Sequence, residues 1–230
     1  FPLYIVGGFV RDLLLGHPGL DLDLVVEGDA LGLARAVVAK HGGKVTVHTR
    51  FKTAQWFPPP ATGLPESVDI ISARSESYKH SAALPTVKPG KLIDDLRRRD
   101  FTINTLALGL SKDHFGELLN YLDGLDDLEA GIVRVLQPAS FEDDPTRLLR
   151  AVRYEQRYGF KIARETLALI PEARLLINRL SAERIRHELD LVLEEENAAS
   201  MLERLAKLGI LNAAHPALEW NKVAHTRFVN

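Results

Sequence analysis

The stretch LYIVGGFVRDLLLGHPGLDLDLVV, from Leu3 to Val26, decides the fold that the sequence predicts. Its first four residues form a short apolar run that stops at Gly7-Gly8, as expected of a strand followed by a turn. Residues 9–15 then carry apolar side chains at helical spacing. Over 21–26, polar and apolar residues alternate before a continuous apolar end, which predicts a second strand entering a core.

The Gly7-Gly8 turn is a candidate phosphate-binding site. A strand that leads into a helix through glycines presents backbone N–H groups and the positive end of the helix dipole to an anion. Arg11 lies one helical turn further on and supplies a positive charge. Glycine pairs are also common in turns that bind nothing, so this turn alone favours a structural role.

Asp21 and Asp23 are a candidate metal-binding pair. Residues two apart on a strand share a face, so the two carboxylates are expected to lie side by side. Adjacent anions repel each other unless a cation lies between them, and Mg²⁺ prefers oxygen ligands of this kind. Turn chemistry with solvated side chains is the alternative for the pair alone. Within one strand–helix–strand unit, the glycine turn and the aspartate pair together favour function.

Composition limits the classes of protein that the chain can represent. It has 230 residues, enough for one large domain or two small ones, and two are preferred here. It contains no cysteine, which excludes disulfides and thiolate metal sites. No signal peptide or long apolar run is apparent, so we expect a cytoplasmic protein without a membrane segment. The net charge of -2 does not indicate a nucleic-acid binder, although arginines concentrate between residues 147 and 186.

The rest of the first half predicts a mixed sheet flanked by helices. A helix is expected at 30–41 and short strands at 44–49, 53–57 and 67–72. Asp69 lies inside the apolar strand VDIIS, where a carboxylate is costly without a partner. It could join Asp21 and Asp23, or it could face outward on an alternating strand; the sequence favours neither.

Two segments before residue 111 carry further candidates. Residues 73–90 are rich in Ser, Lys, Pro and His and predict a long functional loop. Residues 92–110 predict a helix that contains three consecutive arginines. An arginine pair in this run could clamp phosphate, and Asp100 could accept a hydrogen bond from a ribose hydroxyl. A solvated charge run is the alternative.

Beyond Pro138 the pattern becomes helical. Asp143-Asp144-Pro145 predicts a helix start, and Arg147, Arg150 and Arg153 recur three apart, as a positively charged ridge. Such a ridge could read a base edge while holding phosphates, but salt bridging on a solvated face fits equally well. Further helices are expected at 164–177, 182–193 and 201–210, the second of them capped by Ser181.

Five motifs in order resemble those of the class II nucleotidyltransferases. This family comprises the tRNA CCA-adding enzymes, their CC- and A-adding relatives and bacterial poly(A) polymerases. The resemblance extends from Leu3 to His215. Its motifs are GGFVRDLLLG with DLD in the opening stretch, RRDFTIN at 98–104, LDGLDDL at 122–128, DDPTRLLRAVRY at 143–154 and SAERIRHEL at 181–189.

The resemblance implies a role for each motif. Gly8 and Arg11, in the turn that begins at Gly7, would contact the triphosphate, while Asp21 and Asp23 would hold catalytic Mg²⁺. Arg99 and Asp100 would bind the phosphates and sugar of the incoming nucleotide. Asp144 and Arg147 would read its base with Arg150 and Arg153 as basic partners, and Asp69 falls near an acidic position of the family. The family more often has Glu-Asp where this chain has Asp143-Asp144, so the second aspartate is the firmer match.

The implied fold is α+β, with a catalytic head at 1–137 and an all-helical neck and start of a body at 138–230. The head would contain a mixed, mainly antiparallel sheet flanked by helices. The implied reaction adds A, or CCA, from ATP or CTP to the 3′ end of tRNA. A bacterial poly(A) polymerase and an inactive RNA- or nucleotide-binding module are the alternatives. Family members usually continue into further RNA-holding helices, so we expect a fragment; the oligomeric state is not indicated.

Overall fold

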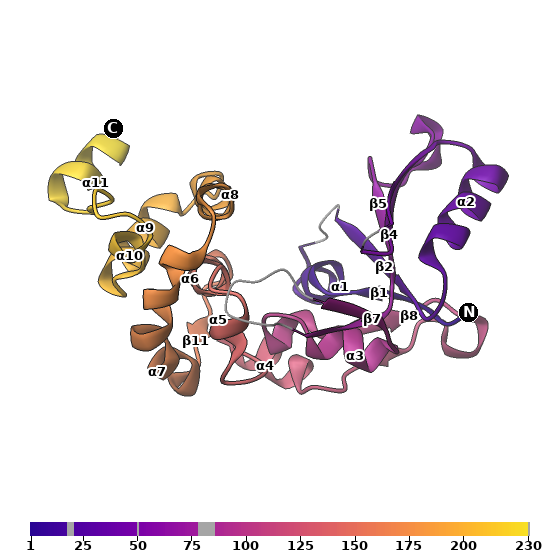
Figure 1. Ribbon diagram of the computed structural model, residues 1–230, viewed down its shortest axis with the longest axis horizontal. Coiled ribbons are helices and arrows are strands. Elements are labelled where there is room, and N and C mark those ends of the chain that lie inside the picture. The colour runs from indigo at the N-terminus through magenta and orange to yellow at the C-terminus, as the bar shows by residue number, and fades with distance from the viewer. Residues whose placement is uncertain (18–20, 50, 78–85, 230) are drawn as a thin grey trace. The chain divides into compact units, whose positions relative to one another are not determined.

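The computed structural model describes residues 1–17, 21–49, 51–77 and 86–229 (Figure 1). They form two compact units, which we describe separately. The first unit contains Phe1–Ser77 and Thr86–Asp126, and the second contains residues from Asp127 onward. The domain boundary predicted between residues 137 and 138 remains a prediction.

The first unit is built on a seven-stranded sheet with the order β3-β4-β5-β2-β1-β8-β9. Only β2 and β5 pair in parallel, so the predicted mixed, mainly antiparallel sheet is confirmed. The strands at 44–49, 53–57 and 67–72 were expected within a residue of their ends. The strands are β1 (Leu3–Val6), β2 (Leu22–Val26), β3 (Lys44–His48), β4 (Thr53–Phe57), β5 (Val68–Ser72), β8 (Ala107–Gly109) and β9 (Leu118–Leu119).

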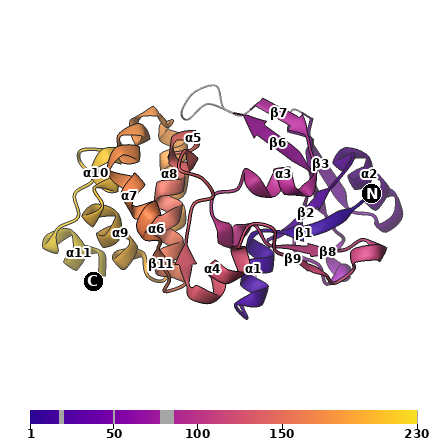
Figure 2. The same ribbon diagram turned by 90° about the horizontal axis from the view of Figure 1, so that it is seen from below.

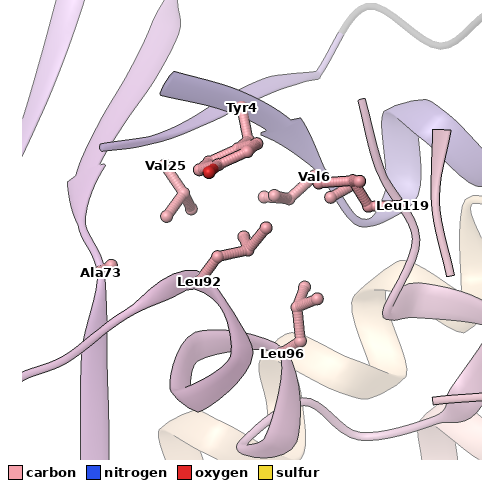
Figure 3. Close-up of a cluster of buried hydrophobic side chains, with 8 residues drawn as sticks. Tyr4, Val6, Val25, Ala73, Leu92, Leu96 and Leu119 are labelled. Atoms are coloured by element: carbon pink, nitrogen blue, oxygen red, sulfur yellow. The ribbon is translucent and has the colours of Figure 1, made fainter. Parts of the chain in front are cut away.

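Helices cover both faces of this sheet. The neighbouring residues Val25 and Val26 of β2 point to opposite faces and belong to different apolar clusters. On one face, helix α2 (Ala30–His41) packs Ala30 and Ala34 against the cluster of Val26. On the other, α3 (Leu92–Arg97) contributes its leucines to a cluster that includes Tyr4, Val6, Val25 and Leu119 (Figure 3). Strand β2 is therefore fixed in the middle of the core.

The prediction of a loop at 73–90 was wrong in part. Strands β6 (Arg74–Ser77) and β7 (Thr86–Pro89) form an antiparallel hairpin, while residues 78–85 lie outside the described part of the chain. Gly90 N donates to Ala73 O at 2.9 Å and closes the base of the hairpin. Because this ribbon pairs outside the main sheet, its strands lack the apolar pattern by which a core strand is recognised.

The prediction of a helix over 92–110 was wrong beyond residue 97. After α3 ends, the chain forms the 3₁₀ turn η2 (Thr102–Asn104) and then β8. The side chain of Asp100 accepts from Phe101 N at 2.9 Å and from Asn104 Nδ2 at 2.8 Å. These bonds offer the backbone an alternative to the helical pattern. The apolar residues of the segment are buried, but in three different elements.

The second unit is mainly helical, as predicted, and α8 and α9 lie beside α6 (Figure 2). The prediction of an all-helical region at 138–230 was wrong at one place, because the short strand β11 lies there and pairs in parallel with β10. The helix predicted at 164–177 turns into a 3₁₀ segment at Arg174. Its elements are β10 (Ile132–Val133), α5 (Ser140–Asp143), α6 (Arg147–Arg157), β11 (Lys161–Ile162), α7 (Arg164–Ala173), η4 (Arg174–Arg179), α8 (Ala182–Leu193), α9 (Ala198–Lys207), α10 (Ile210–Ala214) and α11 (Lys222–Val229).

Two predicted helix starts had different outcomes. Ser181 caps α8, as predicted, by accepting a hydrogen bond from Arg184 N. Asp143 does not begin a helix, because it is the last residue of α5, and α6 begins only at Arg147. Asp144 between them has extended backbone angles, and its side chain accepts from Thr146 N and Thr146 Oγ1.

The remaining short elements are α1 (Gly8–Leu14), η1 (Pro60–Thr62), η3 (Lys112–His114) and α4 (Gly124–Ala130). Across the residues that the structure describes, no helix has both the length and the apolar character needed to cross a membrane.

Candidate nucleotide-binding and metal-binding site

The turn between β1 and α1 depends on Gly7. Its φ of 74° with ψ of -130° is a conformation that residues with a Cβ rarely adopt. A Cβ built on Gly7 would overlap Arg99 Nη1, while Gly7 N donates to Leu106 O at 3.0 Å. Gly7 therefore makes room for a guanidinium against the turn, a role that the sequence alone did not reveal.

Gly7→Ala should destabilise the protein by more than backbone strain alone, because the added methyl group must displace Arg99. Gly42→Ala is the matched control, since Gly42 has a φ of 74° but its Cβ would meet only Pro59 Cγ at 3.6 Å. We expect strain of about 1–3 kcal/mol in both variants and a larger loss in Gly7→Ala. Urea unfolding measures both values, and equal losses would contradict the overlap.

Asp23 and Asp69 are direct neighbours on parallel strands, because β2 and β5 pair them in register. Burial raises the pKa of Asp23; Arg99 lowers it, while Asp69 and Asp21 raise it further. Burial and Asp21 likewise raise the pKa of Asp69, whereas His48 lowers it. Asp69 thus lies beside Asp23 and raises its pKa, while its place among site residues remains a prediction.

Asp21 itself precedes β2 by one residue. Over residues 1–17, 21–49, 51–77 and 86–229, no group of three or more His, Cys, Asp or Glu side chains is arranged to hold a metal ion. The predicted metal pair, Asp21 and Asp23, involves only two such side chains and remains a prediction.

Arg11 is almost completely buried, at 4% exposure. Its Nη1 donates to Asn104 Oδ1 at 2.5 Å, and its Nε and Nη2 both bond the carboxylate of Asp12, at 2.8 and 2.9 Å. Arg11 therefore joins α1 to η2. Gly8 lies beside it, since a Cβ there would stand 3.4 Å from Arg11 Nη2.

Arg99 and Asp100 have different surroundings. Arg99 Nη2 donates to Asp95 Oδ2 at 3.2 Å, and Asp95 is fully buried. Asp100 is 8% exposed, and its Oδ1 accepts the two hydrogen bonds that shape η2. Sequence reasoning missed Asp95, because an acidic residue in the first turn of a helix is usually explained by the helix dipole.

In the second unit, Asp144 and Arg147 are held by other polar groups. Arg147 Nη1 donates to Ser140 Oγ at 2.7 Å, and Arg184 Nη2 donates to Asp144 Oδ1 at 2.7 Å. Arg147 is 7% exposed, so the alternative of a solvated arginine ridge is wrong at this position. Asp143 instead accepts a hydrogen bond from Gln137.

Arg150 and Arg153 converge on Glu188 of α8. Each has a guanidinium nitrogen 3.8 Å from a Glu188 carboxylate oxygen, and both guanidinium groups lie over the ring of Tyr154. Arg153 and Glu188 are buried, and within the described chain Arg153 Nε and Glu188 Oε2 have no hydrogen-bond partner. Periodicity gave no sign that Glu188 is buried. Glu188 and Arg184 both belong to SAERIRHEL, and that motif was the available indication of their role.

Glu188 should make the stability of the protein depend on pH. Burial raises its pKa, Arg150, Arg153 and His187 lower it by less, and Asp144 raises it slightly. A carboxyl group with a raised folded-state pKa binds its proton more tightly in the folded protein, so its stabilising contribution is full below the ordinary value and falls as pH rises through the folded pKa.

We therefore expect the melting temperature of the wild type, relative to Glu188→Gln, to fall as pH rises above the ordinary carboxyl value. Thermal unfolding of both proteins over a pH series measures this difference. If the melting temperature of the wild type instead rose relative to that of Glu188→Gln as pH increased, Arg150 and Arg153 would outweigh burial. Glu183→Gln, at an exposed position of the same helix, serves as the control.

Comparison with known proteins gives consistent matches. Residues 3–134 match the poly A polymerase head domain, and residues 159–221 match a probable RNA and SrmB-binding site of polymerase A. An A-adding tRNA nucleotidyltransferase of Geobacter sulfurreducens is 45% identical over 94% of this chain and 24% of that protein. Another from Halalkalibacterium halodurans is 44% identical over 92% of this chain and 49% of that protein. The chain thus spans about half or less of these relatives.

Solved structures agree with these matches. An apo form of a CCA-adding enzyme has a TM-score of 0.90 at 40% identity, covering 99% of this chain and 53% of that chain. A tRNA nucleotidyltransferase complexed with a primer tRNA and an incoming ATP analog has a TM-score of 0.86 at 35% identity, covering 98% of this chain and 63% of that one.

Proposed function

The chain belongs to the poly A polymerase head-domain family, and from this premise we propose that it adds a nucleotide to an RNA 3′ end without a template. The predicted membership of the nucleotidyltransferase family is confirmed. We propose tRNA as the RNA, ATP as the first nucleotide and CTP as a further one, since the two relatives described above are A-adding enzymes. The observation that carries the proposal is the register of Asp23 beside Asp69, with Arg99 close enough to act on Asp23.

Nucleotidyltransferases of this family generally use a divalent metal ion. We propose Mg²⁺ held by Asp21 and Asp23, with Asp69 beside them. The donor set fits, because carboxylate oxygens are the ligands that Mg²⁺ prefers, and because Asp69 and Asp21 raise the pKa of Asp23, a repulsion that a cation would relieve. When bound, the ion would acidify the primer 3′-hydroxyl and stabilise negative charge on the transferred phosphate.

The protein groups around the turn would bind and orient the nucleotide. Gly7 and Gly8 would accommodate the phosphate chain, while Arg11 and Arg99 would offset its negative charge. Asp100 would accept from the ribose. The primer 3′ oxygen would then attack the α-phosphorus, the bond from that phosphorus to the β-phosphate oxygen would break, and pyrophosphate would leave with the electron pair.

Choice of nucleotide would rest on the second unit. Asp144 offers carboxylate oxygens to an exocyclic amine, which both adenine and cytosine carry, and Arg147 offers donors to ring acceptors. Arg150 and Arg153 would support this pair through α6. We propose a cytoplasmic location, as expected for tRNA end processing.

The assay offers three RNAs, each with labelled ATP or CTP and with or without Mg²⁺. They are a tRNA ending in CC, a tRNA lacking CCA and an unrelated RNA. We expect Mg²⁺-dependent addition of A to the tRNA ending in CC. Long A tails on the unrelated RNA would indicate a poly(A) polymerase instead. ATP binding without any incorporation would indicate a binding module without catalysis.

A further inference from the structure

Asp95 is a fully buried carboxylate that lies between Arg98 and Arg99, and Arg99 belongs to the candidate nucleotide site. Its Oδ1 accepts from Arg98 Nη2 at 2.6 Å and from Arg98 Nε at 2.9 Å, and its Oδ2 accepts from Arg99 Nη2 at 3.2 Å. A buried charge is tolerated only when it is paired, and the two arginines satisfy this condition. Each carboxylate oxygen therefore holds a different guanidinium.

Arg99 depends on Asp95 for its orientation. Within the part of the chain that the structure describes, Asp95 is the one side chain that forms a hydrogen bond or ion pair with Arg99. The Arg99 Nε is buried and has no hydrogen-bond partner there, so no second polar group fixes the plane of the guanidinium. Without Asp95, a long side chain with several rotatable bonds would lose its one directional anchor.

The other terminal nitrogen of the Arg99 guanidinium, Nη1, lies against the glycine turn. Arg99 Nη1 occupies the place that a Cβ of Gly7 would take. The guanidinium thus lies between two elements. Its Nη2 donates to Asp95 of α3, and its Nη1 lies close to Gly7 in the turn between β1 and α1. Helix α3 is itself fixed, because Leu92 and Leu96 are buried in the cluster under the sheet (Figure 3).

We propose that Asp95 is a positioning residue that holds the Arg99 guanidinium against the Gly7-Gly8 turn, where Arg99 meets the phosphates of the incoming nucleotide. The proposal rests on the proposed function, in which Arg99 binds those phosphates. Asp95 touches no substrate itself, and it acts through the direction that it gives to Arg99.

The test is a double-mutant cycle on ligand binding. Asp95→Asn and Arg99→Lys, singly and together, are titrated with ATP and with inorganic tripolyphosphate. Each single change should lower the affinity for both ligands about tenfold, which corresponds to about 1.4 kcal/mol of binding free energy. The double variant should be no weaker than Arg99→Lys alone, because Asp95 acts only through Arg99. If the two losses of affinity multiplied in the double variant, the residues would act independently and the proposal would be overturned.

Two further variants separate positioning from folding. Asp94→Asn is the matched control, because Asp94 caps the same helix by accepting from Lys91 N at 2.9 Å; its ligand affinity should stay at the wild-type value. Asp95→Glu keeps the buried charge while moving the carboxylate. This variant should therefore fold and still bind both ligands more weakly than the wild type. Full affinity in Asp95→Glu and Asp95→Asn would refute the role.

A readout that needs no substrate distinguishes this proposal from the proposed function. In ¹⁵N-arginine NMR spectra, Arg99 Nε–H should exchange slowly with solvent in the wild type, since Nε is buried, and at least about tenfold faster in Asp95→Asn. If the wild type bound no ATP but Asp95→Asn still raised the exchange rate as expected, the proposed nucleotide transfer would be wrong. The positioning of Arg99 by Asp95 would still hold. An unchanged exchange rate would overturn positioning whatever the activity.

Discussion

Replacing Asp21 and Asp23 together by Asn lowers Mg²⁺-dependent nucleotide incorporation by a factor on the order of 10³, the largest loss we expect for any pair of residues. Amide groups cannot supply the negative charge that a divalent cation needs. The measurement is incorporation of labelled ATP into a tRNA ending in CC. Asp113→Asn, an exposed aspartate of the same unit, is the control and should keep full activity.

The same double variant should not be less stable than the wild type in the absence of metal. Asp23 has a raised pKa because it is buried near other carboxylates, so a neutral isostere removes a repulsion. Thermal unfolding without metal should therefore give an equal or higher melting temperature. Full incorporation by the variant would refute the metal assignment, and a large loss of stability would refute the electrostatic reasoning.

We expect Arg147→Gln to lower kcat/KM for ATP by about 100-fold, because the proposed base-binding residue would lose its hydrogen-bond donors. Binding of tripolyphosphate should not change, since this ligand carries no base. The two ligands therefore separate base recognition from phosphate binding. Arg157→Gln is the control, because Arg157 lies on the same helix but is exposed. Equal weakening of ATP and tripolyphosphate would contradict base recognition by Arg147.

The opening strand–helix–strand stretch could be predicted because its information is local. Leu3 to Val26 changes from apolar run to glycine turn to helical spacing within a few residues, and the observed elements follow these changes. Helices α2 and α8 were expected with their observed ends for the same reason. Tertiary pairing only reinforced what local patterns favoured.

The failures of prediction involve partners that are distant in sequence or side chains that compete with the backbone. Residues 92–110 have helical spacing, but the Asp100 side chain accepts hydrogen bonds from Phe101 N and Asn104 Nδ2. The chain then leaves the helix and continues into β8. The arginines of α6 fit a solvated face until Glu188, on α8, is placed beside them. A periodic pattern records which residues are apolar, and it contains no information about which distant carboxylate neutralises a buried cation.

The closed base of the β6–β7 hairpin has a consequence for evolution. The residues that flank it, Ala73 and Gly90, are joined by a hydrogen bond of 2.9 Å, so the chain leaves and returns at one place. A segment with adjoining ends can change in length or composition at little thermodynamic cost to the rest of the molecule. The hairpin could therefore differ in length among proteins that share this sheet, whereas changes at Arg74 or Glu76, which bond Phe51 O and Arg98, would affect the rest of the unit.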